Sequence, residues 1–163
     1  MKSSAEFVHE RQKEIIDACE KLYQTMSFKD ITIIEIGKVT SFTRTSIYNY
    51  FNTKEEIFLA LLQREYEFWI QDLEKIISDN ENLSKENFAD LIAKSLENRK
   101  QLLKLLSMNL FDMEMNSRQE NLIDFKKASF LKGEFVLCRK YLQNLLRKDA
   151  KKLFPRAKNF ISR

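Results

Sequence analysis

Apolar residues recur along most of the chain at spacings of three and four, which places their side chains on one face of an α-helix. One such stripe runs through residues 4–26, and a longer one runs through residues 54–78. The members of the first stripe are Ile15, Ala18, Cys19, Leu22 and Met26, and those of the second are Phe58, Leu61, Leu62, Tyr66, Trp69, Leu73 and Ile76. Both stretches are therefore predicted to be amphipathic helices.

Capping boxes mark four predicted helix starts. In such a box, a Ser or Thr and a Glu three residues later each accept a hydrogen bond from an otherwise unpaired backbone N–H. The pairs are Ser3 with Glu6, Thr32 with Glu35, Thr53 with Glu56, and Ser117 with Glu120. Ile31 and Ile36 add a hydrophobic staple across the second box. Each box precedes a helical pattern, so together they predict where these helices begin.

Seven helices and an all-α fold follow from these patterns. The helices are expected over residues 4–26, 32–39, 44–50, 54–78, 85–96, 99–115 and 117–154, with Pro155 ending the last and residues 156–163 opening another. Two glycines and one proline are too few for a fold rich in turns or sheet corners. We therefore expect an N-terminal three-helix head with a helix-turn-helix, followed by a C-terminal helical bundle.

The helix-turn-helix is predicted from two short helices, residues 32–39 and 44–50, which are separated by a tight turn and followed by a long helix. Ile47 and Phe51 are four residues apart, so they share a face that can pack on the first and fourth helices. The other face then carries groups that can read DNA: a guanidinium for guanine, a methyl and hydroxyl for thymine or phosphate, a phenol for phosphate, and an amide for adenine. The residues are Arg44, Thr45, Tyr48 and Asn49.

Further residues are candidates for contacts with the sugar-phosphate backbone. Thr43 is the expected N-cap of the second short helix, and Ser46 lies near the same helix start. The helix N-termini at Thr32 and Lys54 present free N–H groups and the positive end of the helix dipole. Lys54 also adds a full charge, and Tyr50 offers a hydroxyl nearby.

The alternative is a pair of packing helices with no role in DNA binding. Residues 37–54 favour DNA binding, because they contain Lys38, Arg44 and Lys54 and no acid, whereas a purely structural helix more often exposes Glu and Lys. The overall charge of +4 adds little to this argument. Residues 1–54 carry a net charge of +1, residues 55–125 carry −7 and residues 126–163 carry +10, so the basic surplus falls on the last helix.

Other kinds of site find little support in the sequence. His9 is the only histidine, and there is no metal-ligand cluster, phosphate-cradling glycine loop or paired carboxylate constellation. We therefore expect no metal, no cofactor and no enzymatic activity. Cys19 and Cys138 each fall in an apolar helical pattern and are expected to be reduced, buried thiols. The start is too polar for a signal peptide and no apolar run reaches the roughly 18 residues of a membrane span, so a soluble, cytoplasmic protein is expected.

Residues 15–62 resemble the head of the tetracycline-repressor (TetR) family along their whole length. The most specific part is Tyr48-x-x-Phe51-x-x-Lys54-Glu55-Glu56, the end of the recognition helix and the lysine-led start of the fourth helix. The resemblance implies that positions 44, 45, 46 and 48 approach bases or backbone, and that positions 43, 50 and 54 hold phosphate. The chain differs from the family at the turn, where residues 40–42 read Thr-Ser-Phe instead of Ala-Gly-Val, and at Tyr50, which replaces a frequent histidine. A left-handed backbone at Ser41 would cost roughly 1 kcal/mol relative to glycine.

Residues 100–155 resemble, more loosely, one C-terminal subgroup of the same family. The resemblance implies an effector pocket between the fourth to seventh helices, and two last helices that pair across a two-fold axis. The chain ends where the eighth helix of the family begins, which we read as a truncated form of a longer, homodimeric protein. The predicted domains are residues 1–53, which bind DNA, and residues 54–163, which bind effector and dimerise. Candidate pocket residues, which would alternatively be plain core, are Tyr66, Trp69, Phe88, Met108, Phe111, Met115 and Phe125.

The resulting hypothesis is a repressor that binds a near-palindromic operator on double-stranded DNA as a dimer and releases it when a small apolar effector occupies the body. The alternative is a ligand-independent DNA-binding protein whose body is a protein-interaction module. A cavity of about 300 Å³ or more, lined by the candidate pocket residues, would favour the first. A filled core with an exposed apolar patch would favour the second.

Overall fold

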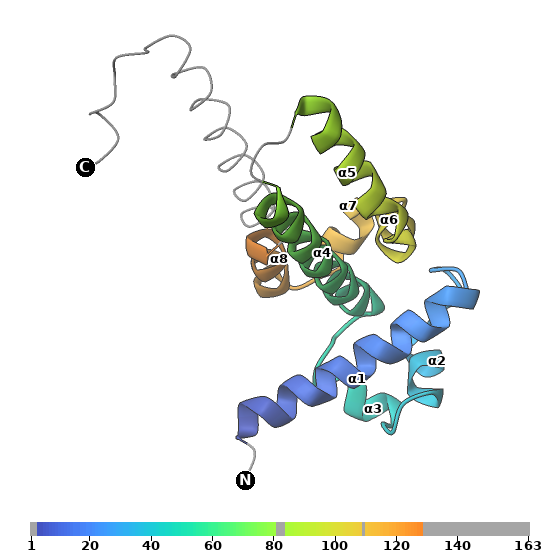
Figure 1. Cartoon of the computed structure of the whole chain (residues 1–163). Coiled ribbons are helices and arrows are strands. Elements are labelled where there is room, and N and C mark those ends of the chain that lie inside the picture. Colours follow the sequence, from blue (N-terminus) through green and yellow to red (C-terminus); the bar gives the residue numbers. More distant parts are fainter. Residues whose placement is uncertain (1–2, 81–83, 109, 129–163) are drawn as a thin grey trace.

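The computed structural model describes residues 3–80, 84–108 and 110–128. Across these residues the regular elements are helices and no strand occurs, so the prediction of an all-α fold is confirmed (Figure 1). The helices are α1 (Ser4–Thr25), α2 (Ile33–Lys38), α3 (Arg44–Ile47), α4 (Lys54–Asp79), α5 (Lys85–Glu97), α6 (Lys100–Leu106), α7 (Leu110–Met115) and α8 (Gln119–Lys126). None of these helices is long and apolar enough to cross a membrane.

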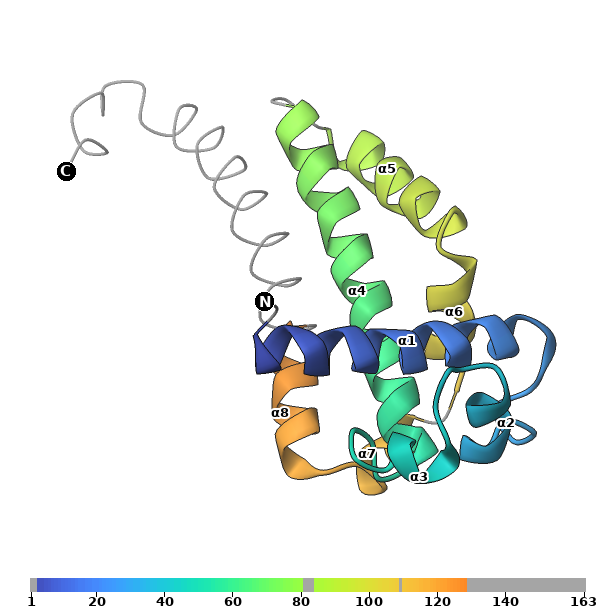
Figure 2. The same ribbon diagram turned by 90° about the horizontal axis from the view of Figure 1, so that it is seen from below.

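Helix α4 forms the centre of the arrangement and contacts α1, α5, α6, α7 and α8. Helices α1, α2 and α3 gather near the N-terminal end of α4, whereas α5 packs along its other end (Figure 1). Helix α8 lies on the opposite side of α4 from α6, as Figures 1 and 2 both show. The helix-turn-helix is therefore connected to the body through α4 and through α1, which contacts both α2 and α4.

The two predicted apolar stripes meet in one core. Ile15 and Cys19 of α1 and Phe58 of α4 are fully buried, and the other members of the stripes, as far as Trp69, are buried or pack against them. Leu73 is buried outside this core cluster, and Ile76 is only partly buried. The body adds Leu102, Leu105, Met113 and Phe125 to the same cluster. Apolar contact therefore continues from the first helix into the body without a gap.

Cys19 is a free thiol at the centre of this core, as expected for a reduced, buried cysteine. Burial raises the pKa of the Cys19 thiol to about 12, so the thiol stays protonated at neutral pH. Cys138, Pro155 and residues 129–154 of the helix predicted over residues 117–154 lie outside the described residues, whereas the start of that helix is α8.

Three of the four predicted caps are confirmed. Ser3 and Glu6 form the complete capping box. Thr32 and Thr53 each accept the backbone N–H three residues on. The predicted return bond from the glutamate is wrong at these two helix starts, where only the cap forms: Glu35 pairs with Lys38, and Glu56 binds partners described below.

The fourth predicted cap is wrong. The hydroxyl of Ser117 donates to the carbonyl of Met113 at 2.7 Å, near the end of α7, and the N-cap position of the next helix is occupied by Arg118. Helix α8 starts two residues later, after Arg118, and has no side-chain cap. At the start of α5, the hydroxyl of Ser84 accepts from the N–H of Asn87, a cap that we did not predict.

Two of the predicted helices are shorter than expected. Helix α3 ends at Ile47 rather than residue 50, because the N–H groups of Asn49 and Tyr50 bond three residues back and tighten the last turn. The helix predicted over residues 99–115 is broken into α6 and α7. At this break the hydroxyl of Ser107 donates to the carbonyl of Lys104 at 2.7 Å and competes with the backbone for it.

The turn between α2 and α3 is held by α1. The N–H of Ser41 donates to the Glu14 carboxylate at 2.8 Å, and Arg11 donates to the Ser41 hydroxyl at 3.3 Å. No described residue has a positive φ, so the left-handed backbone considered for Ser41 does not occur. The turn therefore reaches its shape without glycine.

Gly37 in α2 has room for a side chain. A Cβ at this position would lie 3.7 Å from the Arg44 nitrogen and 3.7 Å from Ile47 Cδ1, which are ordinary van der Waals contacts. Because glycine destabilises a helix relative to alanine, Gly37→Ala is expected to raise the free energy of unfolding by about 0.5–1 kcal/mol, as measured by urea denaturation. Gly37→Val, which adds bulk against Ile47, is the control and is expected to gain less. A loss of stability in the alanine variant would show that the α2–α3 approach is closer than described.

Candidate nucleic-acid interface

Helix α3 is held in place from its buried side. Ile47 is completely buried and Phe51 is 5% exposed, and both belong to the core shared with α1 and α4. At its start, the Thr43 side chain accepts from the N–H of Ser46 at 3.2 Å, which confirms Thr43 as the N-cap. The Thr43 and Ser46 hydroxyls also lie 2.9 Å apart and are hydrogen-bonded to each other. A short helix with one fixed face thus presents its other face to solvent.

The exposed face of α3 and of the turn that follows it carries the four predicted base-reading residues. Arg44, Thr45, Tyr48 and Asn49 are all exposed. The guanidinium of Arg44 donates to the Tyr48 hydroxyl at 3.3 Å and lies 5.7 Å from the centre of its ring. The structure therefore brings a charged hydrogen-bond donor and a phenol together on one exposed surface. Their contacts with individual bases stay a prediction.

Two of the predicted phosphate-binding residues, Lys54 and Tyr50, make contacts within the protein that the sequence did not predict. Lys54 donates to the carbonyls of Phe28 at 2.8 Å and Ile31 at 3.2 Å, and its ammonium lies 4.2 Å from the centre of the Phe28 ring. Two of its three donors therefore fasten the α1–α2 loop to α4. Tyr50 is half-buried with its ring edge-on to Phe42 at 6.0 Å.

Thr32 is exposed at the start of α2, with its hydroxyl accepting from the N–H of Glu35. Its side chain lies at the helix N-terminus, as predicted. A phosphate contact by Thr32, Tyr50 or Lys54 stays a prediction.

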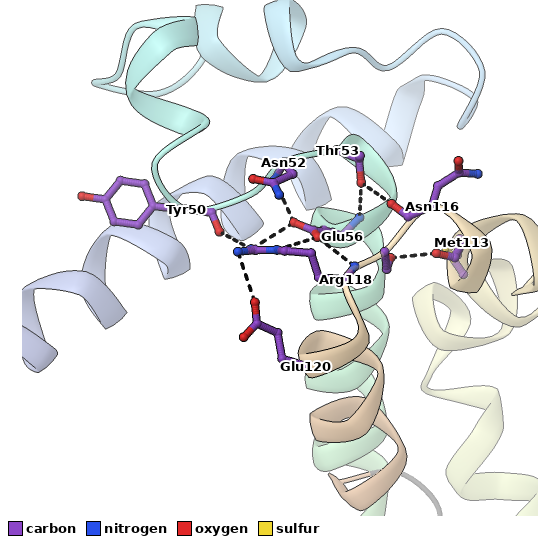
Figure 3. Close-up of polar contacts among 9 residues, drawn as sticks. Tyr50, Asn52, Thr53, Glu56, Met113, Asn116, Arg118 and Glu120 are labelled. Atoms are coloured by element: carbon purple, nitrogen blue, oxygen red, sulfur yellow. Dashed lines mark hydrogen bonds and ion pairs between the residues drawn. The ribbon is translucent and has the colours of Figure 1, made fainter.

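Sequence reasoning missed a junction between the head and the body, centred on Glu56 and Arg118 (Figure 3). Glu56, only 1% exposed, accepts from the N–H of Asn52 at 2.7 Å and from the guanidinium of Arg118 at 2.8 and 3.1 Å. The backbone N–H of Arg118 also donates to Glu56, at 3.0 Å. Arg118 in addition donates to the carbonyl of Tyr50 at 3.2 Å, three residues after the end of α3.

The charge of Glu56 is stabilised by these contacts. Burial alone would raise the pKa of Glu56, but hydrogen bonds from Arg118 and from the Asn52 N–H outweigh burial and hold the pKa below its ordinary value. The carboxylate therefore contributes stability above its ordinary pKa, and that contribution is lost as the pH falls through the lowered pKa.

The pKa of Glu65, which lies nine residues further along α4, is shifted in the opposite direction from that of Glu56. Burial, followed by the nearby charge of Glu20, raises its pKa above the ordinary value. Ionising Glu65 therefore costs more free energy in the folded state than in the unfolded state. As the pH rises from the ordinary pKa of a glutamate through the raised pKa, the free energy of unfolding falls. We expect Glu65→Gln to be more stable than the wild type at neutral pH, with the difference shrinking in acid. Thermal melting across a pH series measures this, and Glu74→Gln on the exposed face of α4 is the control, expected to follow the wild type.

The candidate effector residues mostly lie in packed surroundings. Tyr66 contacts Trp69 and Phe125 with ring centres 6.4 and 6.2 Å apart, and the Trp69 indole N–H donates to the Ser95 hydroxyl at 3.0 Å. Met108 packs against the same core, and Phe88 is partly buried. Met115, in contrast, is 68% exposed and lies on the surface. The side chain of Phe111 lies outside the described residues.

Two surface hollows in the described part of the chain are lined by other residues. One, of about 480 Å³, lies between α1, α4 and α8, with Ile16, Leu59 and Phe68 contributing apolar surface and His9, Lys13 and Asp124 charged or titratable groups. The other, of about 450 Å³, lies between α4 and α5, around Asp72, Ile76 and Leu91. In the described residues no group of three or more His, Cys, Asp or Glu is placed to hold a metal ion.

Two family models match the chain. One, described as "Bacterial regulatory proteins, tetR family", matches residues 15–61, which include the helix-turn-helix and the start of α4. The other, described as "Tetracyclin repressor-like, C-terminal domain", matches residues 63–152. A comparison with curated proteins found no match. Because the two models together span the head and most of the body, the chain belongs to the TetR family of DNA-binding transcriptional regulators.

Proposed function

We propose that this protein is a ligand-responsive repressor that binds a near-palindromic operator as a dimer through α3. The observation that carries the proposal is the exposed, acid-free face of α3, held rigidly by the buried Ile47 and Phe51. Such a face offers hydrogen-bond donors to base edges in the major groove, whereas a helix that only packs would not need it.

Roles follow from the placement of each side chain. Arg44, Thr45, Tyr48 and Asn49 would face the major groove, with the Arg44 guanidinium directed at a guanine edge. Thr32, Thr43, Ser46, Tyr50 and Lys54 would approach phosphates or support the residues that do. The division into a DNA-binding head, residues 1–53, and an effector and dimerisation body, residues 54–163, places the boundary at the start of α4.

Dimerisation is proposed because one α3 reads only half of such an operator. Two recognition helices have to stand about 34 Å apart to enter successive major grooves on one face of DNA. Pairing through the body would set that spacing, and a change in the body would alter it. Full-length protein is therefore expected to bind one operator as two chains.

A second candidate function has its own support. Tyr66 packs against both Trp69 and Phe125, as in a filled core. This packing favours a regulator whose body acts on another protein and binds no small molecule. The two candidates share the DNA-binding head and differ only in what controls it.

The test combines operator selection with ligand screening. Full-length protein would be used to select duplexes from a random-sequence library, and the stoichiometry on the selected duplex would be measured by analytical ultracentrifugation. Two chains per duplex, together with an apolar compound that releases the protein, support the proposal. One chain per duplex contradicts the dimeric operator. Release by a protein and by no compound in a broad apolar library supports the second candidate.

A further inference from the structure

The segment that follows the recognition helix, residues 48–53, forms three hydrogen bonds with residues of the body. Arg118 donates to the Tyr50 carbonyl at 3.2 Å, Glu56 fixes the Asn52 N–H at 2.7 Å, and the Thr53 hydroxyl donates to the Asn116 carbonyl at 2.9 Å. Residues 116–118 belong to the α7–α8 connection, more than sixty positions along the chain from the residues they contact. Figure 3 shows Arg118 lying between Tyr50 on the head and Glu120 on the body, with Glu56 beside it.

Arg118 is the residue that links these contacts. Its Nε and Nη2 atoms lie 2.8 and 3.1 Å from the two oxygens of the Glu56 carboxylate, a bidentate pairing, and Nη2 also reaches Tyr50. Nη1 lies 3.5 Å from Glu120 at the start of α8. The planar guanidinium is thus held on both sides, and a lysine ammonium, which is a point charge, could not reproduce this fork.

The orientation of α3 relative to α4 depends on the groups that Arg118 and Glu56 bind in the connection between the two helices. Only residues 48–53 separate the two helices. Within this segment, the Tyr50 carbonyl and the Asn52 N–H are fixed by Arg118 and Glu56, while Phe51 is buried between them. Releasing either backbone group would let α3 tilt without any change in the residues that face DNA.

We propose that Arg118 is a positioning residue for DNA recognition: it ties the α7–α8 connection to the backbone behind α3 and so sets the angle at which α3 meets the major groove. The inference rests on the proposed use of α3 to read DNA. It adds that a shift of residues 116–118 in the body reaches the recognition helix directly, through hydrogen bonds to its backbone.

The test compares Arg118→Ala and Arg118→Lys with Arg99→Ala. Arg99 is a matched control, because it also pairs with a carboxylate, Asp72, at 2.6 Å and donates to a backbone carbonyl, that of Phe68, at 3.1 Å. Its partners lie on α4, far along the helix from α3. The two arginines make the same kinds of contact, but the Asp72 side chain is 40% exposed and that of Glu56 only 1%, so Arg118→Ala is expected to cost more stability than Arg99→Ala. Only Arg118 contacts the segment behind the recognition helix.

Binding would be measured on a duplex selected from a random-sequence library by the wild-type chain, and on an unselected duplex of equal length, below the melting temperature of every variant. Arg118→Ala is expected to lose about tenfold or more affinity for the selected duplex and little for the unselected one, since misplaced α3 contacts lose base discrimination but keep phosphate attraction. Arg118→Lys is expected to recover only part of this loss, and Arg99→Ala to bind both duplexes like the wild type. Backbone amides of residues 49–52 are expected to exchange faster in Arg118→Ala only.

Equal losses on both duplexes, full recovery by Arg118→Lys, or wild-type binding by Arg118→Ala would each overturn the inference. If Arg118→Ala does not fold, the lysine variant and its amide exchange decide the question alone. Arg44→Ala in the same assay separates this inference from the proposed function. If Arg44→Ala loses the selected duplex and the Arg118 variants do not, α3 reads DNA and Arg118 is only structural. If Arg44→Ala has no effect either, the reading role of α3 fails first.

Discussion

Phe58→Ala is expected to lower the free energy of unfolding by about 3–5 kcal/mol, the largest effect of any single substitution considered for this protein. Phe58 is completely buried on α4 and meets the rings of Tyr23 and Phe28 edge-on, at 5.2 and 4.8 Å between ring centres. Removing it would leave a cavity between α1, the α1–α2 loop and α4, and the surrounding helices cannot close it without moving the helix-turn-helix.

Chemical denaturation followed by circular dichroism measures this loss. The control is Phe68→Ala on the same helix, where the ring is 40% exposed and lies 5.6 Å from the Arg99 guanidinium. That variant is expected to lose no more than about 1 kcal/mol, the value of an exposed cation–π contact. Similar losses in the two variants would mean that the aromatic cluster behind the head is not the centre of the core.

Arg44→Ala is expected to weaken binding to the operator by about 1–3 kcal/mol, which corresponds to roughly 5- to 150-fold in affinity. Arg44 is exposed on α3 and is oriented by its hydrogen bond to Tyr48. If the guanidinium reads a guanine, its removal costs a bidentate contact and also relaxes preference at that base pair. Melting temperature should change little, since the side chain is not part of the core.

Arg44→Lys separates base reading from simple charge attraction. Lysine keeps the positive charge but lacks the fork that matches two guanine acceptors. We therefore expect Arg44→Lys to retain the salt dependence of binding while losing discrimination between the selected duplex and point variants of it. Fluorescence anisotropy titrations at several salt concentrations provide the measurement. Wild-type discrimination in Arg44→Lys would show that Arg44 contacts phosphate and not a base.

Local sequence patterns predicted the parts of the fold that depend on neighbours along the chain. The caps at Ser3, Thr32, Thr43 and Thr53 need only a side chain and an N–H three residues away. Likewise, the buried position of Ile47 follows from helical spacing, and so does the exposure of Arg44. These features are set within one or two helical turns, so the sequence contains the information directly.

Features that depend on distant partners could not be predicted in this way. Glu56 fits a capping box equally well whether its carboxylate turns back to its own helix or out to Arg118, and only the position of the α7–α8 connection decides between them. The same holds for Lys54, whose ammonium is directed to carbonyls of the α1–α2 loop. The sequence held no clear signal for the Arg118 junction, because Ser117 fits the cap of the next helix and Glu120 offers Arg118 a local partner.

The failed cap at Ser117 and the break near Ser107 involve the same local contact. Each hydroxyl donates at 2.7 Å to a carbonyl three or four residues earlier, near the end of a helix. Ser95 makes the same contact inside α5 without ending that helix, so the contact alone does not decide. From sequence, a serine at such a position can equally end one helix or begin the next. The packing of α6, α7 and α8 on α4 selects the ending.

The contacts from residues 116–118 reach the segment behind α3 at the Tyr50 carbonyl, at the Asn52 N–H by way of Glu56, and at the Thr53 hydroxyl, none of which is a side chain of residues 44–49. They are therefore indifferent to which side chains residues 44–49 carry on their exposed face. Reading heads of different sequence could be grafted onto this body, with Ile47 retained, and would still be held at the same angle. If the proposed function holds, a chimera of this kind is expected to bind a new operator while its α3 keeps the orientation set by Arg118.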